Sequence, residues 1–247
     1  PRSFSIEGVM PASPTTKRWT VVLGAVLIQL CLGAIYAWSV FTPVLKDSGW
    51  SKVQTQIVFS VGLAAFALVM VFAGRRLPRY GPRPLAVAGG VILVIGYVIA
   101  GFDGGTNLWF VLLGVGLIGG AGIGLAYVVP IAVGMRWFPD RKGMITGVAV
   151  AGFGFGALGW VKLAGSWGNL IDDHGIDTTF IIYGIAFAAL VLIGSRWMVM
   201  PPEGWLPAGF VPPVVVGEGG EDFEPREMLK TPQFHLISLT FAVSAGA

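Results

Sequence analysis

Six long apolar stretches restrict what this sequence can fold into. They cover residues 19–43, 53–74, 84–102, 107–135, 143–166 and 178–200. A helix that crosses a lipid bilayer needs about 20 mostly apolar residues, and each stretch supplies close to that number or more. Only 12% of the 247 residues are charged, whereas a soluble domain carries about 25%. We therefore predict an all-α integral membrane protein with six spanning helices.

The basic residues predict how these helices are oriented. Cytoplasmic loops of membrane proteins carry an excess of lysine and arginine. Here the basic residues gather before the first stretch, after the second, after the fourth and at the end of the sixth: Lys17 and Arg18; Arg75, Arg76, Arg79 and Arg83; Arg136, Arg141 and Lys142; and Arg196. The alternate loops hold the acidic residues Asp103, Asp172, Asp173 and Asp177. We expect a multi-pass protein of the inner (plasma) membrane with a cytoplasmic N-terminus.

The segments outside the six-helix unit 18–200 differ from it in composition. Residues 1–17 are polar and are expected to form a cytoplasmic tail without a signal peptide, with Met10 as the native start and residues 1–9 not native to the protein. Residues 201–231 are rich in proline, glycine and acid, which predicts a cytoplasmic loop. Residues 232–247 are apolar but too short to span a bilayer alone. We expect them to begin a seventh helix at which the chain is truncated.

Residues with reactive or metal-binding side chains are scarce. Cys31 is the single cysteine and lies within an apolar stretch, so neither a disulfide framework nor a thiolate metal site is expected. His174 and His235 lie at or near loop ends, and no Asp or Glu falls within the six stretches. We predict no catalytic residues, no metal and no cofactor, and hence no enzyme. Membrane topology explains the net charge of +3 better than binding of nucleic acid does.

A pattern of glycine and arginine lies between the second and third stretches. It reads Gly74-Arg-Arg-Leu-Pro-Arg79-Tyr-Gly81-Pro-Arg83 and resembles the loop signature of the major facilitator superfamily, G-x-x-x-D-R-x-G-R-R. In that family the loop latches the two halves of the transporter in one conformation. The resemblance therefore implies a gating role for Gly74, Arg79, Gly81 and Arg83. Pro78 stands where the family has Asp, so this latch lacks one ion-pair partner.

The same loop can be interpreted physically. We expect Gly74 to let the second helix end against a neighbouring helix, and Gly81 to permit a tight turn. Arginines in such a loop can pair with the C-termini of helices. The alternative is that the arginines only satisfy the positive-inside bias.

A longer pattern opens the fifth stretch. Two aromatic residues and two basic residues are followed by small residues in register: Trp137, Phe138, Arg141, Lys142, Gly147, Ala149, Ala151, Gly152 and Gly156. The pattern resembles the helix 5 signature of monocarboxylate transporters, which implies a conformational role for Arg141. Small residues four apart leave one helix face bare, so another helix can approach or slide. We expect Gly147, Gly152 and Gly156 to form this packing face, and ordinary helix packing without transport is the alternative.

Three shorter segments are similar to bacterial oxalate/formate exchangers, which are relatives of the monocarboxylate carriers. They are residues 33–43, 201–205 and 227–234. The combined resemblance extends from about Lys17 to the end of the chain. It implies the N-terminal six-helix half of a twelve-helix major facilitator fold, plus the start of helix 7.

The resemblance also implies a function. We expect a monomeric secondary transporter that moves small monocarboxylates, such as lactate and pyruvate, across the lipid bilayer with a proton, by alternating access. Exchange of carboxylates, as in oxalate/formate antiporters, stays open as the alternative. The arginine that holds the carboxylate is implied on helix 8, beyond Ala247.

The candidate substrate residues follow from the family's architecture, in which helices 1 and 4 line the central cavity. Tyr36 on helix 1 and Tyr127 on helix 4 offer hydroxyl groups that can donate to a carboxylate, and Phe153 on helix 5 can form an apolar wall. The alternative is that these aromatic residues pack between helices or face lipid. Gln29 is either a cavity group or an interhelical hydrogen-bonding residue. Lys162 is expected near the outer interface, where snorkelling explains its charge.

Overall fold

The computed structural model describes residues 15–207, 209–211 and 225–246. The chain divides into two compact units, Pro1–Gly209 and Phe210–Ala247. Most of the predicted N-terminal tail and part of the predicted loop 201–231 lie outside the described residues. All regular elements within the described residues are helical. In the second unit they are α9 (Pro225–Met228) and α10 (Pro232–Gly246).

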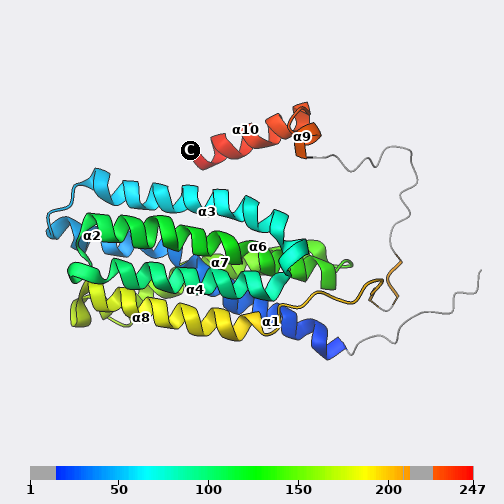
Figure 1. The fold of residues 1–247 in the computed structure, drawn as a ribbon, viewed down its shortest axis with the longest axis horizontal. Helices are drawn as coiled ribbons and strands as arrows, with labels where there is room; N and C mark the ends of the chain where they lie inside the picture. Colours follow the sequence, from blue (N-terminus) through cyan, green and yellow to red (C-terminus); the bar gives the residue numbers. More distant parts are fainter. Residues whose placement is uncertain (1–14, 208, 212–224, 247) are drawn as a thin grey trace, which may run out of the picture. The chain divides into compact units, whose positions relative to one another are not determined.

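The first unit contains six helical segments that are long and apolar enough to cross a membrane (Figure 1). They are Arg18–Asp47, Lys52–Tyr80, Pro82–Ala100, Leu108–Trp137, Lys142–Ala164 and Leu170–Ser195. Each contains most of one of the six apolar stretches of the sequence. The prediction of an all-α, multi-pass membrane protein is confirmed.

Two of the six spans are composite. The first consists of α1 (Thr15–Leu32), the 3₁₀ segment η1 (Gly33–Ala37) and α2 (Trp38–Asp47). The fourth consists of α5 (Leu108–Val111), the π-helical segment η3 (Leu112–Gly119) and α6 (Gly120–Trp137), preceded by the short 3₁₀ segment η2 (Phe102–Gly105). The remaining spans are α3 (Lys52–Tyr80), α4 (Pro82–Ala100), α7 (Lys142–Ala164) and α8 (Leu170–Ser195). Mid-helix 3₁₀ and π segments often mark functional sites.

Two helix boundaries differ from the predicted ones. α3 continues through Gly74 to Tyr80 and is broken at Gly81, whose φ is 79°. The expectation that Gly74 ends this helix is therefore wrong, because the arginine-rich segment after it keeps its helical hydrogen bonds. α8 begins at Leu170, earlier than predicted, and Gly175 with φ 80° kinks it within its first turns.

Glycines let α4 and the fourth span pack backbone to backbone. A Cβ atom added to Gly89 would lie 2.7 Å from the carbonyl oxygen of Gly122, and one added to Gly114 would overlap the carbonyl oxygen of Gly96. No side chain fits at such separations. Small residues give membrane helices this close contact where the hydrophobic effect does not drive them together.

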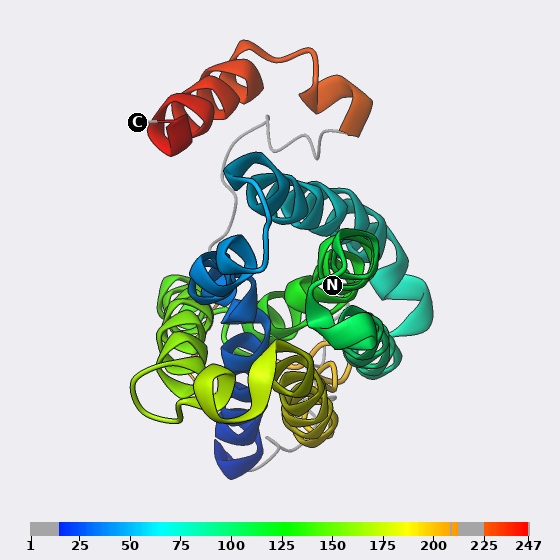
Figure 2. The ribbon, with the colours of Figure 1, turned by 90° about the vertical axis from the view of Figure 1, so that its left-hand side faces the viewer.

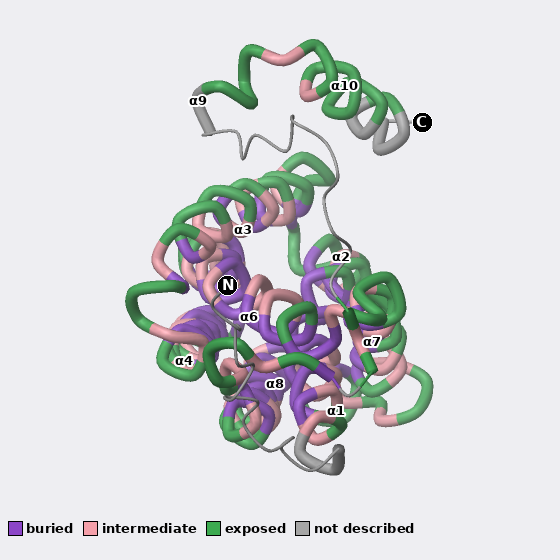
Figure 3. Tube along the Cα trace, turned by 90° about the vertical axis from the view of Figure 1, so that its right-hand side faces the viewer, coloured by how far each residue is buried: buried purple, intermediate pink, exposed green. Residues whose placement is uncertain are grey.

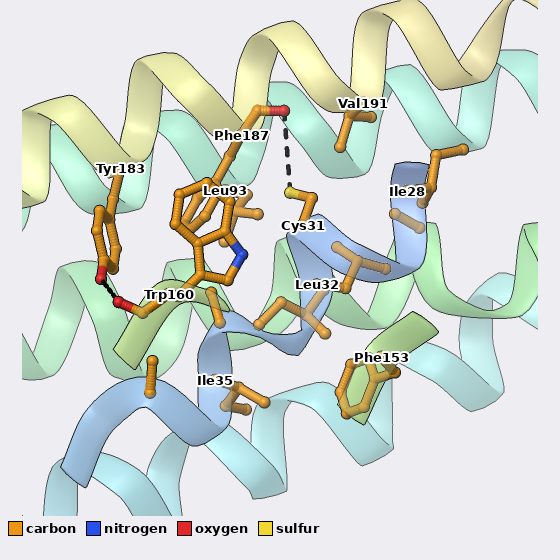
Figure 4. Packing of buried hydrophobic residues seen from close by; sticks show 14 of the residues in the cluster. Ile28, Cys31, Leu32, Ile35, Leu93, Phe153, Trp160, Tyr183, Phe187 and Val191 are labelled. Carbon is orange, nitrogen blue, oxygen red and sulfur yellow. Dashed lines mark hydrogen bonds between the residues drawn. The ribbon is translucent and has the colours of Figure 1, made fainter. Parts of the chain in front are cut away.

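α1 lies between α7 and α8 and also packs against α6 (Figure 2). Its buried side chains include those of Ile28, Cys31 and Leu32 (Figure 4). Trp160 on α7 donates its indole N–H to the carbonyl of Leu30 at 2.8 Å. Tyr183 on α8 in turn donates its hydroxyl to the carbonyl of Trp160 (Figure 4). These two bonds connect three spans and fix the position of α1.

α3 is the most exposed span, and exposed residues run along its outer side (Figure 3). Only 22% of its most apolar segment is buried, against 61% in the first span. Large apolar side chains such as Leu68 and Val71 are exposed. In a membrane protein such a face contacts lipid or another part of the protein.

Candidate functional site

Tyr36 is placed by the 3₁₀ segment that interrupts the first span. The other four residues of η1 are buried, whereas 49% of Tyr36 is exposed. The local break in the helix thus presents one aromatic side chain away from the packed surface of the span.

Tyr127 lies on α6, which follows directly from the π-helical segment η3. Its side chain is half-buried and packs against the core of the first unit. Pro130 lies one turn further along the same helix, where it lacks an N–H and leaves a carbonyl of the preceding turn without its helical partner. Both candidate tyrosines therefore lie on spans whose regular hydrogen bonding is interrupted.

Five aromatic rings form a continuous row that includes both tyrosines. Phe153 lies between Tyr36 and Tyr127, with ring centroids 5.5 Å and 5.2 Å away. Phe66 extends the row beyond Tyr127 at 5.2 Å, and Phe59 extends it beyond Tyr36 at 6.4 Å. We call these five residues the aromatic row. It joins η1, α3, α6 and α7, which are far apart in the sequence.

The structure thus brings the three candidate substrate residues into contact and adds to the same row Phe59 and Phe66, which the sequence alone does not single out. Phe59 and Phe66 lie seven residues apart on α3, and this spacing places them on one helix face. That spacing was the signal available in the sequence. It was not decisive, because α3 carries many other apolar residues.

The hydroxyl groups of the aromatic row are available for a ligand. Within the described residues, neither Tyr36 nor Tyr127 uses its hydroxyl in a hydrogen bond, whereas that of Tyr183 is bound to the carbonyl of Trp160. Phe153 is only 7% exposed, because its ring packs between the two tyrosines. The row therefore offers two O–H donors, one on each side of the apolar ring of Phe153.

Among the described residues, the cation–ring contacts involve Phe138, Trp205, Phe72 and Tyr80, and no member of the aromatic row. Lys162 is in the last turn of α7, and its ammonium lies 3.4 Å from the hydroxyl of Ser166 in an exposed position. This agrees with a location near the interface. No group of three or more His, Cys, Asp or Glu gathers among the described residues.

Two of the predicted gating residues, Arg83 and Arg79, make different contacts. Arg83 donates through Nε to the carbonyl of Ser195 at 3.3 Å and through Nη2 to the carbonyl of Arg196. It thereby pairs with the C-terminus of α8, as arginines favour. Arg79 is exposed and its guanidinium lies 5.7 Å from the ring of Tyr80. The gating role of these residues stays a prediction.

Arg141 belongs to a cluster at the end of the unit where α1 begins. Asp140 forms an ion pair with Arg18 of α1 and approaches Arg141 at 3.5 Å. The guanidinium of Arg18 also lies 3.9 Å from the ring centre of Phe138. Asp140 therefore links the start of α1 to the connection between α6 and α7, beside the residue predicted to have a conformational role.

The glycines of α7 divide into two groups. A Cβ atom on Gly156 would overlap the carbonyl of Leu30 on α1, and one on Gly152 would lie 3.3 Å from the Cβ of Gln29. Gly147 is exposed, and a Cβ there would meet nothing within 4 Å. Within the described residues, Gly152 and Gly156 face α1, and Gly147 does not take part in this contact because it lies on another side of the helix.

Comparison with known proteins identifies the family. The profile of the Major Facilitator Superfamily matches residues 18–247. The chain belongs to the Major Facilitator Superfamily. The matched region covers all six spans, and the fold is that of the N-terminal six-helix half of a major facilitator protein.

Several known proteins are similar to this chain over 60% or more of its length. The uncharacterized MFS-type transporter YhjX of Escherichia coli is 27% identical over 94% of this chain and 55% of its own length. The oxalate:formate antiporter of Oxalobacter formigenes is 27% identical over 93% of this chain and 53% of its own length. Apicoplast pyruvate carrier 1 of Toxoplasma gondii is 28% identical over 60% of this chain and 35% of its own length. The chain therefore spans about half the length of the first two relatives.

Proposed function

We propose that this major facilitator protein is a secondary transporter that moves small monocarboxylates, such as lactate and pyruvate, across the membrane together with a proton. The observation that carries the proposal is the aromatic row, in which two tyrosines with unpaired hydroxyls flank Phe153 within the described residues. Transport proceeds by alternating access, and the gating residues bias its two conformations.

The chemistry of the row suits a small carboxylate. The hydroxyls of Tyr36 and Tyr127 donate to the carboxylate oxygens, and hydrogen bonds to a charged group are worth about 1.5–3 kcal/mol each. The ring of Phe153 contacts the apolar end of the substrate. The compensating positive charge comes from an arginine of the second half of the transporter, since the row itself is uncharged.

The names of similar proteins support this substrate class. One relative is named as a pyruvate carrier. Another is monocarboxylate transporter 13 of Rattus norvegicus, which is 26% identical over 59% of this chain and 34% of its own length. Both names describe carriers of small organic acids. A carboxylate is therefore the substrate class that fits both the aromatic row and these relatives.

Exchange of carboxylates is the second candidate function. It is favoured by the similarity to the oxalate:formate antiporter, which extends over 93% of this chain. An exchanger uses the same row of aromatic donors but takes a second carboxylate, instead of a proton, on the return step. The two candidates share the site and differ in the coupled partner.

The charge distribution supports a location and an orientation for the transporter. Arg18, Arg83, Arg141 and Arg196 lie near the ends of the spans at which the predicted cytoplasmic segments are found. The positive-inside bias places this end in the cytoplasm. We infer an inner (plasma) membrane protein with a cytoplasmic N-terminus that works as a monomer.

Uptake into proteoliposomes tests the function. With the full-length protein, uptake of labelled lactate should rise when an inward proton gradient is imposed, relative to protein-free vesicles. Uptake that requires oxalate or formate inside the vesicles and ignores the gradient would establish the exchanger. Uptake of neither acid under either condition would contradict the proposed substrate class.

A further inference from the structure

Gln29 is a buried amide whose polar atoms have no partner within the described residues. Its exposed fraction is 0%, and neither Oε1 nor Nε2 takes part in a hydrogen bond. Glutamines inside membrane proteins are usually bound to another helix, and a buried polar group left unpaired is costly. The interhelical bond that would explain Gln29 structurally is absent from the described residues.

The surroundings of Gln29 connect it to the aromatic row. Gln29 precedes Tyr36 by seven residues in the first span, and the 3₁₀ segment η1 begins between them. Its Cβ would lie 3.3 Å from a Cβ on Gly152, the residue next to Phe153. The Cβ of Gln29 therefore packs against α7 at Gly152, one residue before the central residue of the row.

A carboxamide differs from the tyrosine hydroxyls in the hydrogen-bonding groups that a ligand must supply to pair with it. Its oxygen only accepts and its nitrogen only donates. A ligand that satisfies both atoms must bring a donor and an acceptor that lie close together. A carboxylate alone brings acceptors only, so it would leave Oε1 unpaired.

We propose that Gln29 is a specificity-determining residue that selects 2-hydroxy monocarboxylates over 2-oxo monocarboxylates. The hydroxyl of a 2-hydroxy acid donates to Oε1, and its carboxylate accepts from Nε2, because the two groups are on adjacent carbon atoms. A 2-oxo acid replaces the donor with a second acceptor. This proposal rests on the proposed function and names which substrates within that class the site prefers.

Contact with Gln29 requires a change in packing. The amide is fully buried in this conformation, and Phe153, the neighbouring ring, is 7% exposed. The substrate meets Gln29 when the packing around Phe153 opens. A Cβ atom on Gly152 would lie 3.3 Å from the Cβ of Gln29, so a side chain there would press on Gln29.

The test compares binding of L-lactate and pyruvate to the full-length protein in detergent, by titration calorimetry. Wild type should bind lactate more tightly than pyruvate. Gln29→Leu should weaken lactate binding by about 5- to 150-fold, the effect of leaving a buried partner unsatisfied, and should change pyruvate binding little. Gln56→Leu is the matched control, because Gln56 lies exposed on α3 and its loss should alter neither acid.

Each other outcome overturns the inference in a distinguishable way. Equal weakening of both acids by Gln29→Leu would make Gln29 a structural residue, and no change in either would mean that the substrate never meets it. If Gln29→Leu does not fold, Gln29→Met, which keeps the length of the side chain, is used instead of it in the same titrations. A wild type that binds neither acid would contradict the proposed function itself, and this inference would fall with it.

Discussion

The rings of Tyr127 and Phe153 meet edge to face, with centroids 5.2 Å apart and planes inclined by 77°. Phe153 makes a second edge contact with Tyr36, at 5.5 Å and 86°. Edge-to-face pairs stabilise by about 0.5–1.5 kcal/mol beyond the area they bury. One ring thus sets the positions of both candidate hydroxyl donors, which come from different spans.

Replacing Phe153 should therefore disturb both stability and binding. Phe153→Leu keeps an apolar side chain but loses two ring contacts, so we expect a loss of about 1–3 kcal/mol in stability and weaker lactate binding. Thermal unfolding in detergent and a binding titration measure the two effects. Phe155→Leu is the matched control, because Phe155 is on the same helix and 67% exposed. Equal effects of the two variants would contradict the central position of Phe153.

The contact between α1 and α7 makes a second prediction. A Cβ on Gly156 would overlap the carbonyl of Leu30, so Gly156→Ala must push the two helices apart. Overpacking of this kind costs about 1–3 kcal/mol, and the unfolding temperature should fall. Gly147→Ala, at an open position of the same helix, should leave it unchanged or slightly higher because alanine favours the helix. A harmless Gly156→Ala would show that the helices do not pack this closely.

Arg83 and Arg79 allow the gating role to be tested. Arg83 caps α8 through the carbonyls of Ser195 and Arg196, whereas the guanidinium of Arg79 lies 5.7 Å from the ring of Tyr80. We expect Arg83→Ala to slow turnover by about 5-fold, the equivalent of roughly 1 kcal/mol, with little change in substrate affinity. Arg79→Ala should slow it less. Transport rates and affinities measured in proteoliposomes test this prediction. Unchanged turnover in both variants would mean that these arginines only satisfy the positive-inside bias.

The six spans were predictable because the length of an apolar stretch is a direct physical requirement of the bilayer. The boundaries were less so. α3 extends through Gly74 to Tyr80 because a helix that leaves the bilayer can continue in water, and apolar content does not report this. The start of α8 at Leu170 was missed for the same reason, since Asp172 and Asp173 read as loop residues.

The candidate site was only partly predictable. The choice of Tyr36, Tyr127 and Phe153 rested on family resemblance, and the structure shows that the three rings touch. Phe59 and Phe66 were missed because single apolar residues on an exposed span carry no distinguishing local signal. The unpaired amide of Gln29 depends on what neighbouring helices place around it, and local sequence contains no information on that.

The breaks in the first and fourth spans were also not foreseen. The apolar stretch 107–135 predicts one regular helix, and the structure forms a π segment over Leu112–Gly119 within it. Such a segment depends on the close approach of α3 and α4 to this backbone, since Gly114 contacts α4 and Gly116 contacts α3. Tertiary packing, rather than local preference, decides between the α and π forms here.

A lactate titration of wild type, Tyr127→Phe and Tyr183→Phe tests the central claim, that the aromatic row binds the substrate carboxylate. Tyr127→Phe removes one hydroxyl that has no partner among the described residues, and should weaken binding by about 10- to 150-fold, equivalent to about 1.5–3 kcal/mol. Its unfolding temperature should not change. Tyr183→Phe removes a hydroxyl bound to the Trp160 carbonyl, so it should lower the unfolding temperature and leave affinity intact. Equal lactate affinity in wild type and Tyr127→Phe would contradict the account.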